Sequence, residues 1–332
     1  MRTLFRPAAI ALATLLVAAA CTSAASPTPA PSAAPSVAPV TAAPETAAPS
    51  LAASEAPSAA PSVAPSPTPE ACAPGSLATV TPGRLTIGTD NPAYPPYFEP
   101  SDPNPAPWEL GDPTNANGFE SAVAYAVAMK LGFTPDQVDW VYVPFTNSYA
   151  PGPKTFDFDI NQVSWKPERA EVVDLSRSYY FVNQSVVTKA DSPLAAAKTV
   201  ADMKKFKFGA QVGTTSYDTI VNVIAPTQEP AVYDTNDAAI EALKAGQIDG
   251  IVVDLPTAFY MTAAQLDNGV IVGQFISPAD KAGEYFSLVL AKDSPLTPCV
   301  DQVLLGMRSD GSLDTITKVW LSEKVNAPVI AP

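Results

Sequence analysis

The sequence predicts an α/β protein with two folded domains built on largely parallel sheets. Short apolar runs typical of strands alternate with amphipathic segments typical of helices, and this alternation is typical of parallel strands covered by helices. A length of 332 residues favours two domains over one. Residues 1–75 differ in composition from the rest and are assigned to neither domain.

The first folded unit begins with an apolar strand at 85–89. A helix is expected at 120–130, because its apolar residues recur at helical spacing, and Gly132 is a suitable end for it. Strands are expected again at 140–143 and 159–163. This strand–helix–strand order indicates a parallel arrangement.

A second unit follows an extended crossing segment at 181–188. Thr235 or Asn236 is a suitable N-cap for one of its helices, and Gly246 a suitable end. The remaining strands are expected at 207–211, 248–253 and 285–290. The remaining helices are expected at 200–205, 216–223, 237–245, 298–307 and 313–321.

Residues 1–21 are assigned as a lipoprotein signal peptide. Arg2 and Arg6 precede an apolar stretch at 8–20 that is too short to span a bilayer. Small residues directly before Cys21 suggest that its sulfur is acylated and that it becomes the mature N-terminus. Ordinary signal cleavage is the alternative.

The next segment, 22–75, is predicted to be a disordered Pro/Ala/Ser linker. Residues 22–71 contain no Lys, Arg or aromatic residue, and such a composition buries too little apolar surface to fold. Its prolines make it a semi-rigid spacer. A passive tail without a required length is the alternative.

Two further cysteines, Cys72 and Cys299, form an even pair in an oxidising compartment. We expect a disulfide that joins the start of the folded region to the C-terminal helical segment. Two free thiols are the alternative. The sequence has no CxxC pair and no histidine to activate a thiolate, so a redox role is not expected.

The formal net charge of −14 argues against nucleic acid and against a basic membrane-docking patch. No metal site is expected, because histidine is absent and no carboxylates have metal-loop spacing. The turn at Gly213 lacks the lysine of a phosphate-binding loop. No cofactor is therefore predicted.

The most informative segment is 156–180, FDFDINQVSWKPERAEVVDLSRSYY, in which Arg169 follows a short polar stretch. An arginine fork can donate two parallel hydrogen bonds to a carboxylate. A surface ion pair with Glu168 or Glu171 is the alternative for an isolated arginine.

This segment stands in order with four others: LTIGTDNPAYPPY at 85–97, GFE at 118–120, VGTTS at 212–216 and GQIDGIVVD at 246–254. Together they resemble the extracytoplasmic amino-acid-binding proteins of ABC importers, over about residues 85–323. The resemblance implies a two-lobed periplasmic-binding-protein type II fold, each lobe a mainly parallel sheet flanked by helices. A two-segment hinge would join lobe 1, at 76–181 and 278–332, to lobe 2, at 182–277.

The resemblance also implies a ligand site for a zwitterion. Arg169 matches the family's carboxylate-binding arginine, and Asp254 matches its ammonium-binding aspartate. Thr214 and Thr215 match further carboxylate donors at a helix N-terminus, with plain helix capping as the alternative. Ser164 matches a hydroxyl that contacts the ammonium.

Asp90, Tyr94, Phe145 and Gln211 match positions around the ligand side chain. Asp90 could pair with a cationic or amide group, and the two aromatic residues could enclose an extended chain. Core packing is the alternative for the aromatic residues. Gln162, like Asn161, is larger than the residue usual at its position and would narrow or polarise the pocket.

The resemblance implies a monomeric lipoprotein, anchored outside the cytoplasm, that delivers a polar or basic amino acid to ABC permease subunits. A cyclohexadienyl dehydratase-like enzyme and a ligand sensor without transport are alternatives on the same fold. An enzyme is not expected, because no histidine is available for acid–base chemistry and no Glu sits at a matched cleft position.

Overall fold

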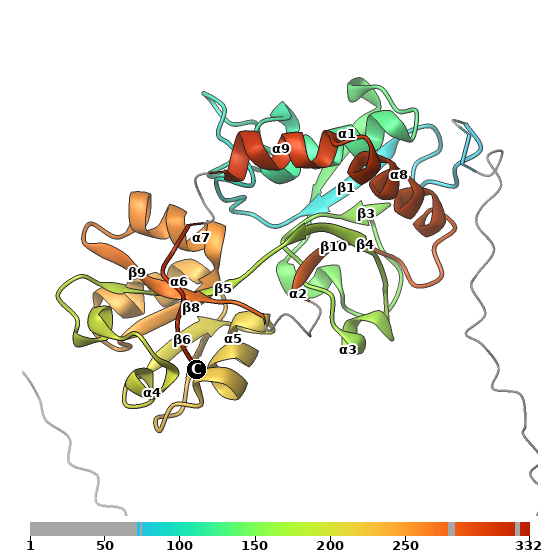
Figure 1. Cartoon of the computed structure of the whole chain (residues 1–332). Coiled ribbons are helices and arrows are strands. Elements are labelled where there is room, and N and C mark those ends of the chain that lie inside the picture. The colour runs from blue at the N-terminus through green and yellow to red at the C-terminus, as the bar shows by residue number, and fades with distance from the viewer. Residues whose placement is uncertain (1–71, 74, 278–282, 323–325) are drawn as a thin grey trace, which may run out of the picture. The chain divides into compact units, whose positions relative to one another are not determined.

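The computed structural model describes residues 72–73, 75–277, 283–322 and 326–332. These residues form two five-stranded sheets flanked by helices, which confirms the predicted two-lobed α/β fold (Figure 1). The signal peptide with Cys21, and the linker up to residue 71, lie outside the described residues. No described helix is long and apolar enough to cross a bilayer.

Lobe 1 is built on a mixed sheet. Strands β2 and β3 run parallel to β1, and β10 runs antiparallel to its neighbours β3 and β4. Its strands, in sheet order, are β2 (Val138–Tyr142), β1 (Leu85–Thr89), β3 (Phe158–Asp159), β10 (Tyr285–Leu290) and β4 (Asp174–Phe181).

Helices cover both faces of the lobe 1 sheet. A large buried core on one face includes Ile87 and Phe158 of the sheet together with Val127 and Leu304 of the long helices. A smaller cluster around Val289 covers the other face. The long helices are α1 (Phe119–Lys130), α8 (Thr297–Ser309) and α9 (Ser312–Leu321); the short helical segments are α2 (Phe145–Ser148), α3 (Pro167–Ala170), η1 (Pro113–Asn115) and η2 (Pro135–Gln137).

Lobe 2 repeats the plan with a mixed sheet of its own. Its strands, in sheet order, are β7 (Ala231–Tyr233), β6 (Phe208–Gln211), β8 (Gly250–Asp254), β5 (Gln184–Lys189) and β9 (Gly269–Phe275). Its helices are α4 (Val200–Met203), α5 (Thr215–Thr219), α6 (Asn236–Lys244) and α7 (Leu255–Tyr260), with the 3₁₀ segment η3 (Pro193–Ala196) and the π-helical segments η4 (Ile220–Ile224) and η5 (Met261–Gln265). Gly246, at φ +69°, follows the end of α6, as expected of a residue that adopts the left-handed region.

The strand expected at 159–163 ends early. Only Phe158–Asp159 pair as β3, and Gln162 adopts a left-handed conformation with φ +48°. The buried Glu120 carboxylate accepts the backbone N–H of Gln162 at 2.8 Å and so stabilises this turn. The chain then rejoins the sheet through a single bridge from Ser164 to Phe286.

The C-terminal residues differ from the expected assignment of 278–332 to lobe 1. Residues 326–332 lie on lobe 2, where the backbone of Gln274 donates to Pro328 O at 2.7 Å and accepts from Ile330 N at 3.0 Å. Strand β9 is at the edge of its sheet, so its free backbone groups are available to an added segment. Burial of Ile330 in the lobe 2 core adds apolar contact.

Cys72 and Cys299 are joined in a disulfide, as predicted. The bond ties the first described residue of the chain to α8. Both residues belong to the lobe 1 core or pack against it.

Candidate functional site

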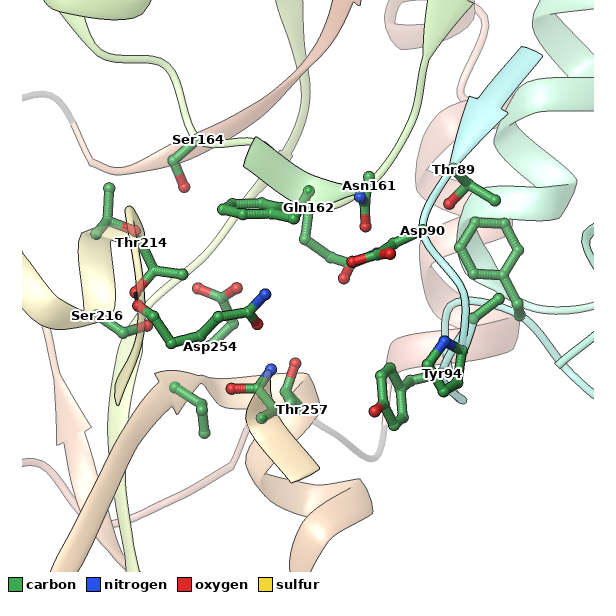
Figure 2. A pocket seen from close by; sticks show the side chains of 18 of the residues that line it. Thr89, Asp90, Tyr94, Asn161, Gln162, Ser164, Thr214, Ser216, Asp254 and Thr257 are labelled. Carbon is green, nitrogen blue, oxygen red and sulfur yellow. Dashed lines mark hydrogen bonds between the residues drawn. The ribbon is translucent and has the colours of Figure 1, made fainter. Parts of the chain in front are cut away.

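One cavity brings together all the residues that the sequence predicted for ligand binding (Figure 2). They come from both lobes: from lobe 1, Asp90, Tyr94, Phe145, Gln162, Ser164 and Arg169; from lobe 2, Gln211, Thr214, Thr215 and Asp254. Most follow the carboxyl end of a strand, the place where open α/β sheets bind ligands.

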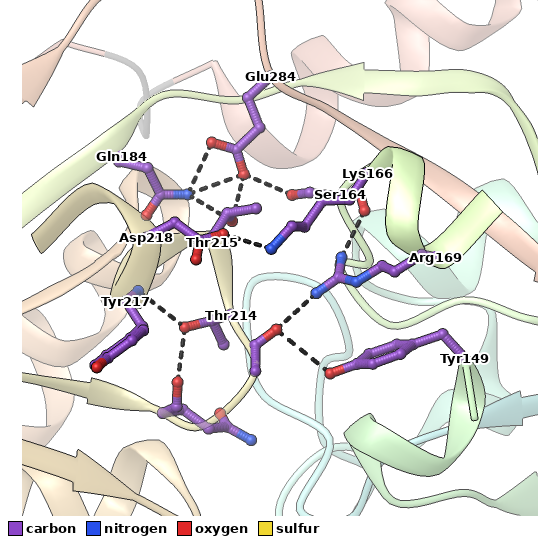
Figure 3. Close-up of polar contacts among 12 residues, drawn as sticks. Tyr149, Ser164, Lys166, Arg169, Gln184, Thr214, Thr215, Tyr217, Asp218 and Glu284 are labelled. Carbon is purple, nitrogen blue, oxygen red and sulfur yellow. Dashed lines mark hydrogen bonds and ion pairs between the residues drawn. The ribbon is translucent and has the colours of Figure 1, made fainter. Parts of the chain in front are cut away.

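The Arg169 side chain is fixed at the lobe boundary. It is 5% exposed, and its guanidinium donates to the backbone oxygens of Ser164 and, at 2.8 Å, Gly213 (Figure 3). The guanidinium also lies 4.3 Å from the centre of the Tyr149 ring and 5.7 Å from that of Phe145. With five N–H donors, arginine retains hydrogens for a ligand carboxylate after these two bonds.

Thr214 is the N-cap of α5. Its hydroxyl oxygen accepts from Tyr217 N at 3.2 Å, and its hydrogen goes to Gln211 O at 2.7 Å. The capping interpretation therefore holds for Thr214, whose hydroxyl lines the cavity with its own hydrogen already donated.

A carboxylate that the sequence analysis missed connects the two lobes. Glu284 accepts from Ser164 Oγ at 2.6 Å and from Thr215 Oγ1 at 2.5 Å (Figure 3). Gln184 Nε2 lies 3.1 Å from both Glu284 oxygens and 2.7 Å from Asp254 Oδ1. Gln184 begins β5 and Glu284 directly precedes β10, and each strand follows a crossing between the lobes. This position is the only feature of the sequence that could have marked the two residues as part of the site.

Asp254 ends strand β8 and lies among these groups. Burial, and then the nearby Glu284 carboxylate, raise the pKa of Asp254 well above its usual value. Arg169 acts in the opposite direction. The pair of carboxylates therefore favours a positively charged group beside Asp254.

Tyr94 closes the other end of the cavity by a contact across the lobes. Its hydroxyl donates to Asp237 Oδ2 at 2.7 Å, and Asp237 also accepts from Gln265. Asp90 lies nearby, accepts from Asn91 N at 2.8 Å, and has a pKa raised by burial.

Several buried polar atoms around Asp90 have no hydrogen-bond partner among the described residues. They include Thr89 Oγ1 and Asn161 Nδ2, whose residues line the cavity, and both carboxylate oxygens of Asp159. Leaving such atoms unpaired is unfavourable, so this end of the cavity suits a polar ligand group.

Glu120 lies beneath the cavity and is completely buried. Its carboxylate accepts from the backbone and side-chain amides of Gln162 and from the Tyr179 hydroxyl. Burial raises the pKa of Glu120 from 4.5 to about 7. The Gln162 side chain, expected to shape the pocket, is thus held by Glu120.

The raised pKa of Glu120 predicts a pH-dependent stability. The folded chain keeps a proton that the unfolded chain loses between pH 4.5 and 7, so the stability from this group is full below pH 4.5 and is lost as the pH rises towards 7. We expect this fall in the free energy of unfolding to be roughly 3 kcal/mol and to be absent in Glu120→Gln. Urea unfolding at a series of pH values would measure it; an unchanged slope would contradict the assignment.

The described residues contain no group of three Asp, Glu or Cys side chains that could hold a metal ion. The geometry instead offers a buried cation, Arg169, and a partly buried carboxylate, Asp254, on opposite lobes, with polar atoms beyond them. These features define a two-lobed receptor for a small polar solute.

The chain belongs to the bacterial extracellular solute-binding proteins, family 3, whose model matches residues 100–323. It is 25% identical over 219 residues to the arginine-binding extracellular protein ArtP of Bacillus subtilis (strain 168), covering 65% of this chain and 82% of ArtP. It is 26% identical over 250 residues to the L-cystine-binding protein TcyJ of Escherichia coli (strain K12), covering 73% and 84%. The family expected from the sequence is thereby confirmed.

Solved structures of amino-acid-binding proteins are also similar to this chain. An ancestral arginine-binding protein bound to glutamine matches with a TM-score of 0.56 and 26% identity, covering 72% of this chain and 97% of that chain. The ancestral amino acid-binding protein AncCDT-1, a precursor of cyclohexadienyl dehydratase, matches with a TM-score of 0.55 and 25% identity, covering 72% and 95%.

Proposed function

We propose that this protein is an extracytoplasmic lipoprotein that captures an amino acid between its lobes and delivers it to the permease of an ABC transporter. The observation that carries the proposal is the pairing of Arg169 and Asp254 in one cavity. An amino acid has a carboxylate and an ammonium on one carbon, and burying both requires a partner for each.

The far end of the cavity favours a polar or basic ligand side chain. Asp90 supplies an acceptor there, with Asp159 behind it, and Thr89 and Asn161 offer unpaired polar atoms. Among the described residues, the lining contains no lysine or arginine besides Arg169. An anionic side chain would therefore meet carboxylates without a cation.

Binding first to one lobe, followed by closure, would complete the site. Arg169 belongs to lobe 1 and Asp254 to lobe 2, so only a closed form contacts both ends of the zwitterion. An acylated Cys21, followed by the proline-rich segment, would hold this receptor near the permease.

A thermal-shift screen of the twenty amino acids tests the proposal. A ligand at 100 times its dissociation constant adds about 2.7 kcal/mol of stability, so we expect a clear rise in Tm with basic or polar amino acids. Asp90→Asn should reduce the shift for arginine more than for glutamine. A chain that responds to none of the twenty, but converts prephenate or arogenate, would support the dehydratase-like alternative instead.

A further inference from the structure

Glu284 contacts the ligand-binding hydroxyls from outside the cavity. Ser164, Thr215 and Asp254 all line the cavity between the lobes, whereas Glu284 lines a neighbouring groove with Trp165, Asp218 and Tyr285. Thr215 lines both the cavity and this groove and so lies between them. The Glu284 carboxylate therefore contacts these hydroxyls from the groove and not from the cavity. It accepts a hydrogen from each of them (Figure 3). A ligand in the cavity would not need to displace it.

The number of hydrogens on each hydroxyl determines whether Ser164 and Thr215 can donate to a ligand or only accept from it. A serine or threonine hydroxyl has a single hydrogen and two lone pairs. Ser164 and Thr215 donate those hydrogens to Glu284 Oε1, at 2.6 and 2.5 Å. Only lone pairs remain for the cavity, so both hydroxyls face a ligand as acceptors.

Gln184 extends this arrangement to Asp254. Its amide donates to Asp254 Oδ1 at 2.7 Å and to the Glu284 oxygens at 3.1 Å, while its carbonyl oxygen accepts from Ser216 Oγ at 2.7 Å. An amide nitrogen has two hydrogens, so both donors of Gln184 are directed at carboxylates. The longer 3.3 Å contact to Thr215 leaves that hydroxyl a lone pair.

We propose that Glu284 is a positioning residue that sets the polarity of the site, so that Ser164, Thr215 and Asp254 together accept the three hydrogens of a ligand α-ammonium. This inference rests on the proposed function and deepens it. It changes the role expected for Thr215, from a donor to the ligand carboxylate to an acceptor from the ammonium. Recognition of the carboxylate is then left mainly to Arg169.

The inference predicts that Glu284 governs discrimination between ligands with and without the α-ammonium. In Glu284→Gln, the new amide can donate to both hydroxyls and so turn their hydrogens towards the cavity. Each amino acid that binds the wild-type chain is compared by calorimetry with its analogue lacking the α-ammonium; for L-arginine this is 5-guanidinopentanoate. We expect Glu284→Gln to weaken the amino acid at least tenfold and the analogue less than threefold.

Two further variants separate positioning from a general structural effect. Asp218→Asn removes a carboxylate from the same groove, but this carboxylate pairs with Lys166 across the lobes, at 2.6 Å. The substitution should leave the ratio of the affinities for the amino acid and for its analogue unchanged, even if each affinity changes. In a Ser164→Ala/Thr215→Val background, Glu284→Gln should alter that ratio less than twofold, because the hydroxyls that it orients are gone.

The outcomes are distinct. A wild-type chain that binds no amino acid contradicts the proposed function, and this inference with it. A wild-type chain that binds, with a Glu284→Gln variant that weakens both ligands equally or neither, contradicts the inference alone. Thermal unfolding of each variant without ligand confirms that the compared chains are folded.

Discussion

Replacing Arg169 by alanine is expected to weaken amino-acid binding by roughly 2–5 kcal/mol, about 30- to several-thousand-fold. Arg169 is 5% exposed, and its guanidinium is the only cation among the described residues that line the cavity. A ligand carboxylate buried without it would be unpaired. Isothermal titration calorimetry measures the loss.

The planar shape of the Arg169 guanidinium and its contacts with aromatic rings should contribute to ligand affinity as well as its charge. Arg169→Lys keeps a cation but loses the second parallel hydrogen bond and the flat surface that lies over Tyr149, so it should restore only part of the affinity. Arg177→Ala is a suitable control, since Arg177 is exposed on β4 and does not line the cavity. A loss below fivefold in Arg169→Ala would contradict the assignment.

The electrostatic arrangement explains why lobe closure and ligand binding should be linked. In this structure Asp254 lies close to the Glu284 carboxylate, and burial, followed by this second carboxylate, raises the pKa of Asp254. An α-ammonium placed beside Asp254 would remove that repulsion. The carboxylate of the same ligand would pair with Arg169, so one molecule would neutralise groups on both lobes.

Local sequence patterns were sufficient to predict most of the framework. The strands at Leu85 and Tyr285 and the long helices α1, α8 and α9 have buried residues at regular spacing, and the structure contains them close to their expected bounds. The exception at β3 has a tertiary cause, because the buried carboxylate of Glu120 holds Gln162 in a left-handed turn. No local pattern around Gln162 carries that information.

The site residues that lie in a recognisable sequence motif could be predicted. Those that are brought together from distant segments only by folding could not. Arg169 and Asp254 stand in recognisable segments, and both line the cavity. Glu284 and Gln184 lie 100 residues apart in the sequence and meet only because both crossings between lobes pass the same point. The docking of residues 326–332 on β9 is likewise set by a free sheet edge, which is a property of the folded lobe.

Removing the Cys72–Cys299 disulfide is expected to lower the free energy of unfolding of lobe 1 by roughly 2–5 kcal/mol. The two residues are separated by 227 positions, and Cys299 is 2% exposed in the lobe 1 core. A closed loop of this length restricts the unfolded chain strongly in the loop-entropy account. The paired substitution Cys72→Ser/Cys299→Ser avoids leaving a single reactive thiol.

The chain offers a lobe-specific readout for this loss. All four tryptophans, Trp108, Trp140, Trp165 and Trp320, belong to lobe 1, so their fluorescence during urea unfolding follows that lobe even if the two lobes unfold separately. Neither cysteine lines the cavity, and ligand affinity at low urea should therefore change less than twofold. A tryptophan transition that moves by less than about 1 kcal/mol would mean that core packing of α8, rather than the covalent bond, holds the start of the folded chain in place.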